Sequence, residues 1–443
     1  DGKTAAADNA CIAVARSLGR AAAAKGLIMA GFDDIRSIQY FKTDLRPYWN
    51  RRGDSTIERL FALAAGDYPV LNEKCREFDL ELMETATREG GRKYAELCAL
   101  AYRQAIAAHK LVESPDGDLM LLSKENASNG SIGTVDISYP SAPLFLYYNP
   151  ELCKALLNHI FHYSESGKWQ KPFPAHDVGT YPQANGQTYK HDMPVEESGN
   201  MLVLTAAIAA AEGNAEYARR HWKELTRWAE YLVENGLDPD NQLCTDDFAG
   251  HFAHNANLSI KAIMGIASYG YCARMLGMQE VADSYFAKAR EMAGEWVRMA
   301  DDGDHYRLTF DKSGTWSQKY NLVWDKLLGF GIFPESVARK EIAYYLHKQN
   351  RYGLPLDSRR QWTKSDWIVW SATLADDRKS FEALVEPVWN FMNETVLRVP
   401  MSDWYKSDVP AHVIFKARAV VGGYWIKMLE SKYTAKKQEN RIR

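Results

Sequence analysis

The sequence predicts a mainly α-helical protein whose helices form hairpins arranged in a toroid. Roughly a dozen segments after residue 54 repeat apolar residues at spacings of three and four, the period of a helix with one buried face. Short turns and long polar loops alternate between these segments, so one rim of a ring of hairpins would carry the turns and the other the loops. With 443 residues the chain is too long for an ordinary single core, but it suits a large ring.

The first 45 residues differ from the rest and predict remnant strands or a linker. Apolar runs at 10–16 and 25–32, and a partly alternating segment at 35–41, are typical of short strands. They are expected to be the last strands of a β domain. The chain starts at Asp1 with neither an initiator Met nor a signal segment, which favours a processed product or part of a longer protein.

The toroid is predicted to occupy residues 46–432, followed by a charged tail at 433–443. Ser55-Thr-Ile-Glu58 is a capping-box pattern that opens the first helix. Asn214 can cap a later helix, and Gly236 can end it. Predicted helices span residues 69–89, 92–112, 149–163, 196–212, 218–235, 255–276, 278–300, 318–328, 334–348, 363–375, 379–395 and 409–429.

Composition excludes several classes of protein. Lys and Arg number 54 against 57 Asp and Glu, and the net charge of −3 gives no basis for binding nucleic acid. No apolar run is long enough to cross a membrane. Gly-rich nucleotide motifs do not occur, and the six cysteines form no CxxC spacing. We therefore predict no cofactor and no metal.

The predicted long loops gather carboxylates beside Trp, Tyr, Asn, His and Lys. This mixture is typical of hydrolysis of a polar small molecule, since carboxylates transfer protons, amides and Lys orient oxygens, and aromatic faces stack on the substrate. A funnel on the long-loop rim is therefore the predicted active site. The loops are residues 113–148, 164–195, 237–254, 301–317, 349–362 and 396–408.

Two segments carry adjacent carboxylates beside a helix start. Glu196 and Glu197 follow a proline and precede an apolar run, and Asp246 and Asp247 precede a second one. Neighbours on a helix point in different directions, so at most one of each pair is expected to be catalytic. Paired carboxylates can hydrolyse a glycosidic bond, with an acid and a base or nucleophile on either side of it. Further catalytic candidates from other loops are Asp357 and Asp366.

Amide hydrolysis is the second option. Thr363-Lys364-Ser365 has the residue types for a Lys-activated hydroxyl, but Thr and Ser just before a helix are ordinary caps, and the capping interpretation is favoured. A carboxylate-activated water would serve instead. His251 and His254 have a spacing that a metal could use, although HxxH without further ligands is weak evidence for a metal site.

Several longer segments resemble the glutaminase A family, a group of large extracytoplasmic proteins of fungi and Bacteroidetes. They are KENASNGSIGTVDISYPSAPLFLYYNPEL, MPVEESGNMLVL, TDDFAGHFAHNANLSIKAI, YNLVWDKLLG, YGLPLDSR and TKSDW, and the match extends from about residue 33 to about residue 429. The resemblance implies an (α/α)6 toroid of six helical hairpins, the six-hairpin glycosidase-like fold, behind an N-terminal β-sandwich. Most of that β-rich region is expected to be missing here and to pack on the toroid.

The family name implies hydrolysis of L-glutamine to L-glutamate and ammonia, and an extracytoplasmic location. The alternative is a six-hairpin glycoside hydrolase that uses the same carboxylates on an oligosaccharide, and a third interpretation is a non-catalytic carbohydrate-binding or scaffold protein. For either hydrolase the partner is a small molecule, glutamine or a sugar. Candidates for substrate binding on the long-loop rim are Asp136, His176, Asp177, Asn255, Asn257, Lys319, Trp324, Asp325, Arg359, Asp403 and Trp404.

Overall fold

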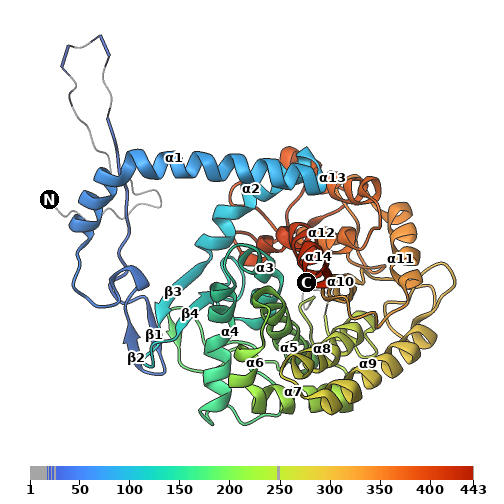
Figure 1. Ribbon diagram of the computed structural model, residues 1–443. Helices are drawn as coiled ribbons and strands as arrows, with labels where there is room; N and C mark the ends of the chain where they lie inside the picture. Colours follow the sequence, from blue (N-terminus) through green and yellow to red (C-terminus); the bar gives the residue numbers. More distant parts are fainter. Residues whose placement is uncertain (1–16, 18, 21, 24–25, 247–249, 443) are drawn as a thin grey trace.

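The computed structural model describes the chain except residues 1–16, 18, 21, 24, 25, 247–249 and 443, and its helices form a ring (Figure 1). In the described part the α-helices are α1 (Ile57–Gly90), α2 (Arg92–Ala107), α3 (Val135–Tyr148), α4 (Pro150–Glu165), α5 (Pro194–Glu212), α6 (Glu216–Arg220), α7 (Trp222–Asn235), α8 (Ala256–Met275), α9 (Gln279–Ala300), α10 (Val323–Leu328), α11 (Glu335–Lys348), α12 (Ser365–Thr373), α13 (Arg378–Glu394) and α14 (Ile426–Ile442). Short 3-10 helices are η1 (Tyr48–Asn50), η3 (Tyr320–Leu322) and η4 (Ala419–Trp425).

Three small sheets accompany the helices in the described residues. Strand β1 (Ile38–Tyr40) pairs antiparallel with β2 (Thr43–Leu45) and parallel with β5 (Gln183–Ala184). Strands β3 (His109–Glu113) and β4 (Leu119–Ser123) form a hairpin beside α4. Strand β6 (Trp362–Lys364) pairs antiparallel with β7 (Trp404–Lys406), which places Lys364 opposite Trp404.

The inner helices of the ring are buried on every side. Every side chain from Val195 to Ala209 in α5 is buried, and so is every one in α12. A helix that is apolar all round has no polar face to turn to solvent, so it belongs inside the protein. Neighbour contacts close the inner ring in the order α3, α5, α8, η3 with α10, α12, and η4 with α14, which returns to α3.

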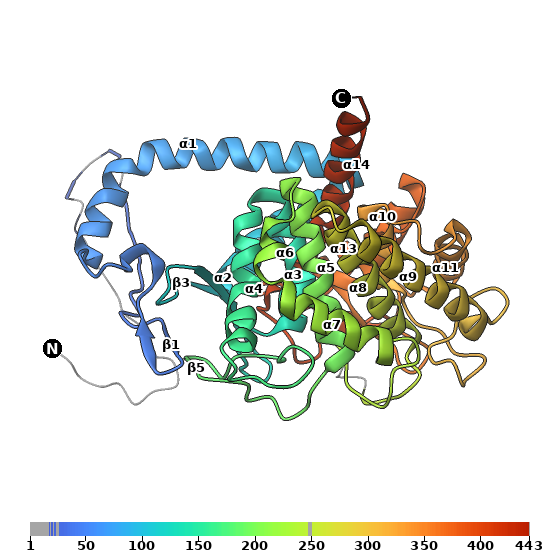
Figure 2. The ribbon, with the colours of Figure 1, turned by 60° about the horizontal axis from the view of Figure 1, so that its bottom comes forward.

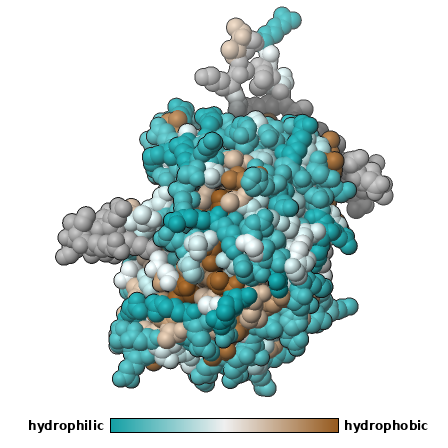
Figure 3. Space-filling view, turned by 90° about the vertical axis from the view of Figure 1, so that its right-hand side faces the viewer, coloured by the Kyte–Doolittle hydropathy of each residue, from teal (hydrophilic) through white to brown (hydrophobic). Residues whose placement is uncertain are grey.

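The outer helices are amphipathic, and their buried stripes pack on the inner ring. In α7 the buried side chains include Leu225, Trp228, Ala229 and Leu232, at the spacings that the sequence predicts. The outer layer consists of α2, α4, α7, α9, α11 and α13 (Figure 1). The face at the right of Figure 1, over α9 and α11, is mostly hydrophilic with small hydrophobic areas between (Figure 3). None of the described helices combines the length and apolar content needed to cross a membrane.

The inner helices run in the same direction, so their two ends form different rims. At the C-terminal rim, Lys326 of α10 donates to the carbonyls of Thr373, the last residue of α12, and of Ala375 just after it. Tyr433 of α14 donates to the Ala207 carbonyl of α5. The long loops gather on the opposite side, at the bottom of Figure 2. The N-termini of α3, α5, α8 and α12 therefore share the rim with the long loops.

Helix α3 corrects the prediction of a single loop over residues 113–148. The prolines at positions 140 and 143 favour a loop in sequence, yet both lie inside α3. The helix is stabilised by packing rather than propensity, because η4 approaches it backbone to backbone. A Cβ on Gly422 would lie 2.7 Å from the Ser141 carbonyl oxygen, so only glycine fits there.

Other segment boundaries also differ from the prediction. The predicted helix at 92–112 ends at Ala107, because the following residues pair as β3 with β4. Residues 409–418 are not helical, since Val413 donates to the Trp404 carbonyl and holds the segment beside β7. Helix α14 continues through residue 433, where a tail was predicted.

The N-terminal strand predictions are only partly correct. Residues 26–32 form no strand, and of 35–41 only Ile38–Tyr40 pairs with other strands. The run at 10–16 lies outside the described residues. Helix α1 then begins after Thr56, whose side chain accepts from the Arg59 backbone N–H, so Thr56 and not Ser55 is the cap. Helix α1 lies along the outside of the ring (Figures 1 and 2).

Substituting alanine for Gly199 is expected to lower the free energy of unfolding by about 1–3 kcal/mol, the usual cost of overpacking. A Cβ at this position would lie 2.5 Å from Lys261 Cγ, where α5 meets α8. Gly294, on the exposed side of α9, has no atom within 4 Å of an added Cβ and is the matched control. Gly294→Ala should stabilise the protein by about 0.5–1 kcal/mol. Urea unfolding of both variants tests the expectation, and equal stabilisation would contradict it.

Candidate active site

The long-loop rim collects acidic residues at the first turns of inner helices. Asp136 lies in the first turn of α3, Glu196 and Glu197 in that of α5, and Asp366 in that of α12. The N-terminus of a helix carries partial positive charge, which stabilises carboxylates there. All four side chains are buried. This arrangement agrees with the prediction that the acids lie at helix N-termini on one rim.

Asp246 is held at this rim by two hydrogen-bond donors. Tyr320 donates its hydroxyl to Oδ2 at 2.8 Å, and Trp367 donates its indole N–H to Oδ1 at 3.1 Å. The two aromatic rings stack with centroids 3.9 Å apart, which fixes both donors. Burial raises the pKa of Asp246 to about 6, against the opposing charge of Lys364. Its sequence neighbour Asp247 lies outside the described residues.

Asp366 is fully buried, and neither carboxylate oxygen has a hydrogen-bond partner among the described residues. The Lys364 ammonium lies 3.4 Å from Oδ2. Burial raises the pKa of Asp366 to about 6, against the charge of Lys364. The same ammonium lies over the ring of Trp367, which binds Asp246. Lys364 thus lowers the pKa of both acids and joins them into one electrostatic unit.

Glu196 is bound to a buried lysine of the next inner helix. Lys261 of α8 donates to Glu196 Oε1 and, at 2.8 Å, to Asn200 Oδ1. Asn200 in turn donates to Glu196 Oε1 at 3.2 Å. The Lys261 side chain is 0% exposed and that of Glu196 is 1% exposed, so water does not hydrate this ion pair. Glu196 therefore points toward α8.

Glu197 points toward α3 and the loop before α5. Burial, together with the charge of Asp136, raises the pKa of Glu197 well above its usual value. His176 lies in the same group, with Nε2 3.6 Å from Asp136 Oδ1 and Nδ1 2.8 Å from Asp177 Oδ2. Burial alone would lower the pKa of His176, but the bond to Asp177 and the charge of Asp136 raise it to about 10.

Two arginines complete the charged rim. Arg418 lies 2.5 Å from Asp403 and 3.5 Å from Glu125, and all three side chains are buried. Arg359 binds Asp357 through both its side chain and its backbone N–H. The rim therefore combines protonatable acids with cations that are already paired, an arrangement suited to proton transfer.

Comparison with known families decides the classification. Residues 91–428 match the model of the glutaminase A six helical-hairpin domain. The chain belongs to the glutaminase A six-hairpin family. Residues 2–85 match a domain of unknown function, DUF5127, so the boundary between the two matches lies near the end of α1.

Two curated relatives are similar over most of the chain. Glutaminase A of Aspergillus oryzae is 32% identical over 428 residues, which cover 93% of this chain and 61% of the relative. A probable glutaminase of Arthroderma benhamiae is 30% identical, and the match covers 78% of this chain and 50% of the relative. The chain thus spans about half to three fifths of the length of these glutaminase A family members.

Solved structures confirm the six-hairpin fold. A wild-type glycosidase has a TM-score of 0.55 at 12% identity, with 78% of this chain and 98% of the glycosidase covered. An α-mannosidase of Streptococcus pneumoniae, from a family described as metal-independent, has a TM-score of 0.56 at 12% identity, with 82% and 98% covered. At this identity the likeness shows the fold alone. It confirms the predicted mainly α toroid of the glutaminase A family.

Several predicted substrate contacts of this glutaminase A family domain have partners inside the fold. The Lys319 ammonium donates to the carbonyls of Tyr306 and Ser317. Trp324 is fully buried, and Asp325 accepts from two backbone N–H groups after α10, on the C-terminal side of that helix. Asp325 therefore lies on the C-terminal side of α10, which corrects its place on the long-loop rim. Lys319 stays at that rim, because it directly precedes η3, whose Tyr320 binds Asp246.

Three further predicted residues also serve the local structure. Asn255 caps α8 by accepting from the backbone N–H groups of two following residues. Asp177 accepts from the backbone N–H groups of Gly179, Thr188 and Tyr189, so it holds its loop together. Trp404 packs against two aromatic rings beside β6. Asn257 is buried at the same rim, with Oδ1 unpartnered among the described residues.

The structure does not assemble the Lys-activated hydroxyl or the HxxH metal site that were considered from the sequence. Thr363 donates its hydroxyl to the Leu354 carbonyl, and Lys364 faces Asp366 rather than a hydroxyl. His254 is half-buried and binds Asp238. Three charged residues of the site, Glu125, Lys261 and Arg418, were not predicted from the sequence. Only Lys261 had a sequence signal that could have identified it. Lys261 is a charge inside the otherwise apolar run of α8, which marks a buried ion pair.

Proposed function

We propose that this chain carries the active site of a hydrolase that releases ammonia from L-glutamine, with Asp246 as the general base and Asp366 as the general acid. The observation that carries the proposal is the pair of buried carboxyl groups, each with a pKa raised to about 6 and both under the field of Lys364. Groups with pKa values near the working pH transfer protons most efficiently. The relatives named as glutaminases support the choice of substrate.

The two acids have different surroundings, which assigns their roles. Asp246 accepts two hydrogen bonds, and these stabilise its carboxylate form. Asp366 accepts none among the described residues, so its protonated form is favoured by comparison. The Asp246 carboxylate removes a proton from water as the water oxygen adds to the side-chain amide carbon. Asp366 gives its proton to the nitrogen as the C–N bond breaks, which yields glutamate and ammonia.

A glycoside hydrolase is the second candidate, and the pairing of the cations favours it. The α-carboxylate of glutamine needs a cation, yet three cations at this rim already have carboxylate partners, whereas a sugar is neutral. These pairs are Lys261–Glu196, Arg359–Asp357 and Arg418–Asp403. The same acid and base would protonate the glycosidic oxygen and activate water. In both cases an extracytoplasmic location, which the family resemblance implies, belongs to the proposal.

Parallel assays of one preparation test the proposal. Ammonia release from L-glutamine is measured with L-asparagine as the control amide, beside sugar release from aryl glycosides and oligosaccharides. Ammonia from glutamine that is lost in Asp246→Asn supports the proposal. Sugar release without ammonia would replace it with the glycosidase, and no product from either panel would contradict both.

The pH dependence of kcat/KM is expected to be bell-shaped with a maximum near pH 6. The base must be ionised, so activity falls as the pH drops below the pKa of Asp246, about 6. The acid must be protonated, so activity falls as the pH rises above the pKa of Asp366, also about 6. Tyr320→Phe removes a hydrogen bond to the carboxylate and should move the acidic limb to higher pH. A flat profile between pH 5 and 8 would contradict these assignments.

A further inference from the structure

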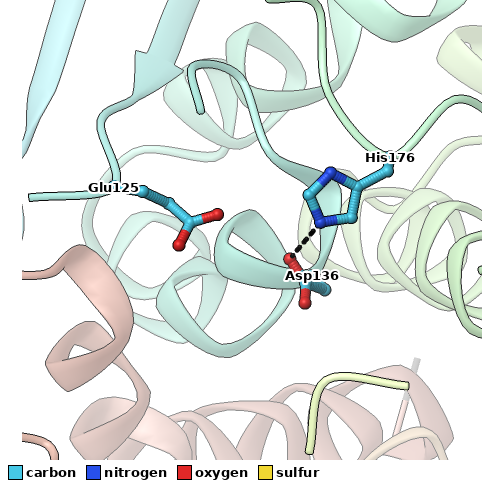
Figure 4. A group of neighbouring side chains, drawn as sticks. All are labelled: Glu125, Asp136 and His176. Atoms are coloured by element: carbon cyan, nitrogen blue, oxygen red, sulfur yellow. Dashed lines mark ion pairs between the residues drawn. The ribbon is translucent and has the colours of Figure 1, made fainter. Parts of the chain in front are cut away.

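Three buried side chains from separate segments converge beside the first turn of α3 (Figure 4). Glu125 comes from the loop after β4, Asp136 from α3 and His176 from the loop before α5. One donor atom of each lies within 4.8 Å of the others. Ligands about 2.1–2.4 Å from a common cation lie about 3–4.7 Å apart, so small side-chain movements bring all three into contact with one ion.

The imidazole of His176 is oriented as in a metal-binding histidine. Both carboxylate oxygens of Asp177 accept backbone N–H groups, so Asp177 acts as a hydrogen-bond acceptor. The Nδ1 atom of His176, 2.8 Å from Asp177 Oδ2, must then be the donor. Nε2 is left facing Asp136 Oδ1 at 3.6 Å. A carboxylate that binds one ring nitrogen while the other faces a cation is the common outer partner of metal-binding histidines.

A second observation points to a cation at this place. Glu197 Oε1 is fully buried and has no hydrogen-bond partner among the described residues. Its carboxyl lies beside Asp136 and His176, whose charges both act on it. His176 and Arg418 are the cations of this group, and Arg418, whose Nη1 lies 3.5 Å from Glu125 Oε2, is shared with Asp403. Buried carboxylates in excess of their cations are costly, and a bound divalent cation removes that cost.

We propose that Glu125, Asp136 and His176 bind a divalent cation of the Mn²⁺ to Zn²⁺ class, with Asp177 as the outer partner of the histidine and Glu197 as a fourth oxygen donor. Mixed imidazole and carboxylate donors suit these ions better than Ca²⁺ or Mg²⁺, which prefer oxygen alone. The ion would tie the loop after β4 and the loop before α5 to the start of α3. This site is separate from the proposed acid and base, so it stands independently of the proposed function.

Direct metal binding tests the site without any assay of activity. Metal-free wild-type protein is titrated with Zn²⁺ and Mn²⁺ in a calorimeter, and bound metal is counted by elemental analysis. One ion per chain is expected. Glu125→Gln, Asp136→Asn and His176→Gln should each weaken binding at least 100-fold. Asp177→Asn keeps all the ligands and should weaken it about 10–100-fold, as loss of an outer partner does.

His221→Gln is the matched control, because His221 is also buried and its Nδ1 lies 2.6 Å from a carboxylate, that of Glu165. This variant should bind the ion as the wild type does. The electron paramagnetic resonance spectrum of Mn²⁺ bound to wild type should show coupling to an imidazole nitrogen, and this needs no variant to fold. Absence of saturable binding to wild type, a bound ion without nitrogen coupling, or unchanged affinity in His176→Gln would overturn the proposal.

Discussion

Replacing Asp246 with asparagine is expected to reduce kcat/KM by roughly 10²–10⁴-fold, the contribution typical of a general acid or base. Asparagine has the same shape and can still accept a hydrogen bond from Trp367 or Tyr320, but it cannot take a proton from water. The measurement is the initial rate on the substrate identified in the parallel assays, at the pH of maximal wild-type activity. Asp240→Asn, an exposed aspartate in the same loop, should keep wild-type activity.

Stability separates a catalytic role of Asp246 from a structural one. The folded protein raises the pKa of Asp246 to about 6, above its unfolded value of about 3.9. A raised pKa favours the fold below the unfolded pKa, and this contribution is lost as the pH rises through 6. At pH 7.5 the native state therefore bears a buried charge that asparagine removes. We expect the thermal midpoint of Asp246→Asn at pH 7.5 to be equal to or above that of wild type.

The opposite pattern would remove Asp246 from the mechanism. If the variant keeps more than about a tenth of wild-type kcat/KM, Asp246 does not contribute the roughly 100-fold rate increase expected of a general base. A variant that loses both activity and thermal stability would assign Asp246 to the fold, through its bonds to Tyr320 and Trp367. Activity lost with stability kept supports the proposed role.

The ring of helices could be predicted because its signals are local. Inner helices such as α5 are apolar on all sides, and outer helices such as α7 have a single apolar stripe. Acids at the starts of α5 and α12 were predictable for the same reason, since a helix start is readable from a few residues. Helix α3 was missed because its two prolines argue against a helix locally, while its stability comes from η4, nearly 300 residues later in the chain.

The connections within the site could not be predicted, because each joins segments far apart in sequence. Lys261 is 65 residues from Glu196, and Asp246 is 121 residues from Trp367. Adjacent acids were expected to face different directions, and Glu196 and Glu197 do so, but which neighbour each one meets depends on the packing of α5 between α3 and α8. An acid that transfers protons is distinguished from one that stabilises the ring of helices by the residue it binds, and sequence shows only that the acid is there.

Replacing Lys261 with methionine is expected to lower the free energy of unfolding by about 3–5 kcal/mol, the usual cost of breaking a buried ion pair. Methionine keeps the length of the side chain but leaves the carboxylate of Glu196 buried, with Asn200 as its remaining donor. Urea unfolding at pH 7 measures the loss. Arg298→Met is the control, since Arg298 and Glu295 form an exposed pair on α9 and such pairs contribute at most about 1 kcal/mol.

The double variant Lys261→Met with Glu196→Gln distinguishes charge from packing. If the loss comes from an unpaired buried charge, removing that charge as well should restore most of the stability, because a neutral amide needs far less compensation than a carboxylate. Adding Glu196→Gln to Lys261→Met should then raise the free energy of unfolding, whereas an ordinary core substitution lowers it. The effects of the two substitutions are therefore expected to be strongly non-additive, as for residues in direct contact. A double variant as unstable as Lys261→Met alone would instead assign the loss to the packing of α5 against α8 around Gly199.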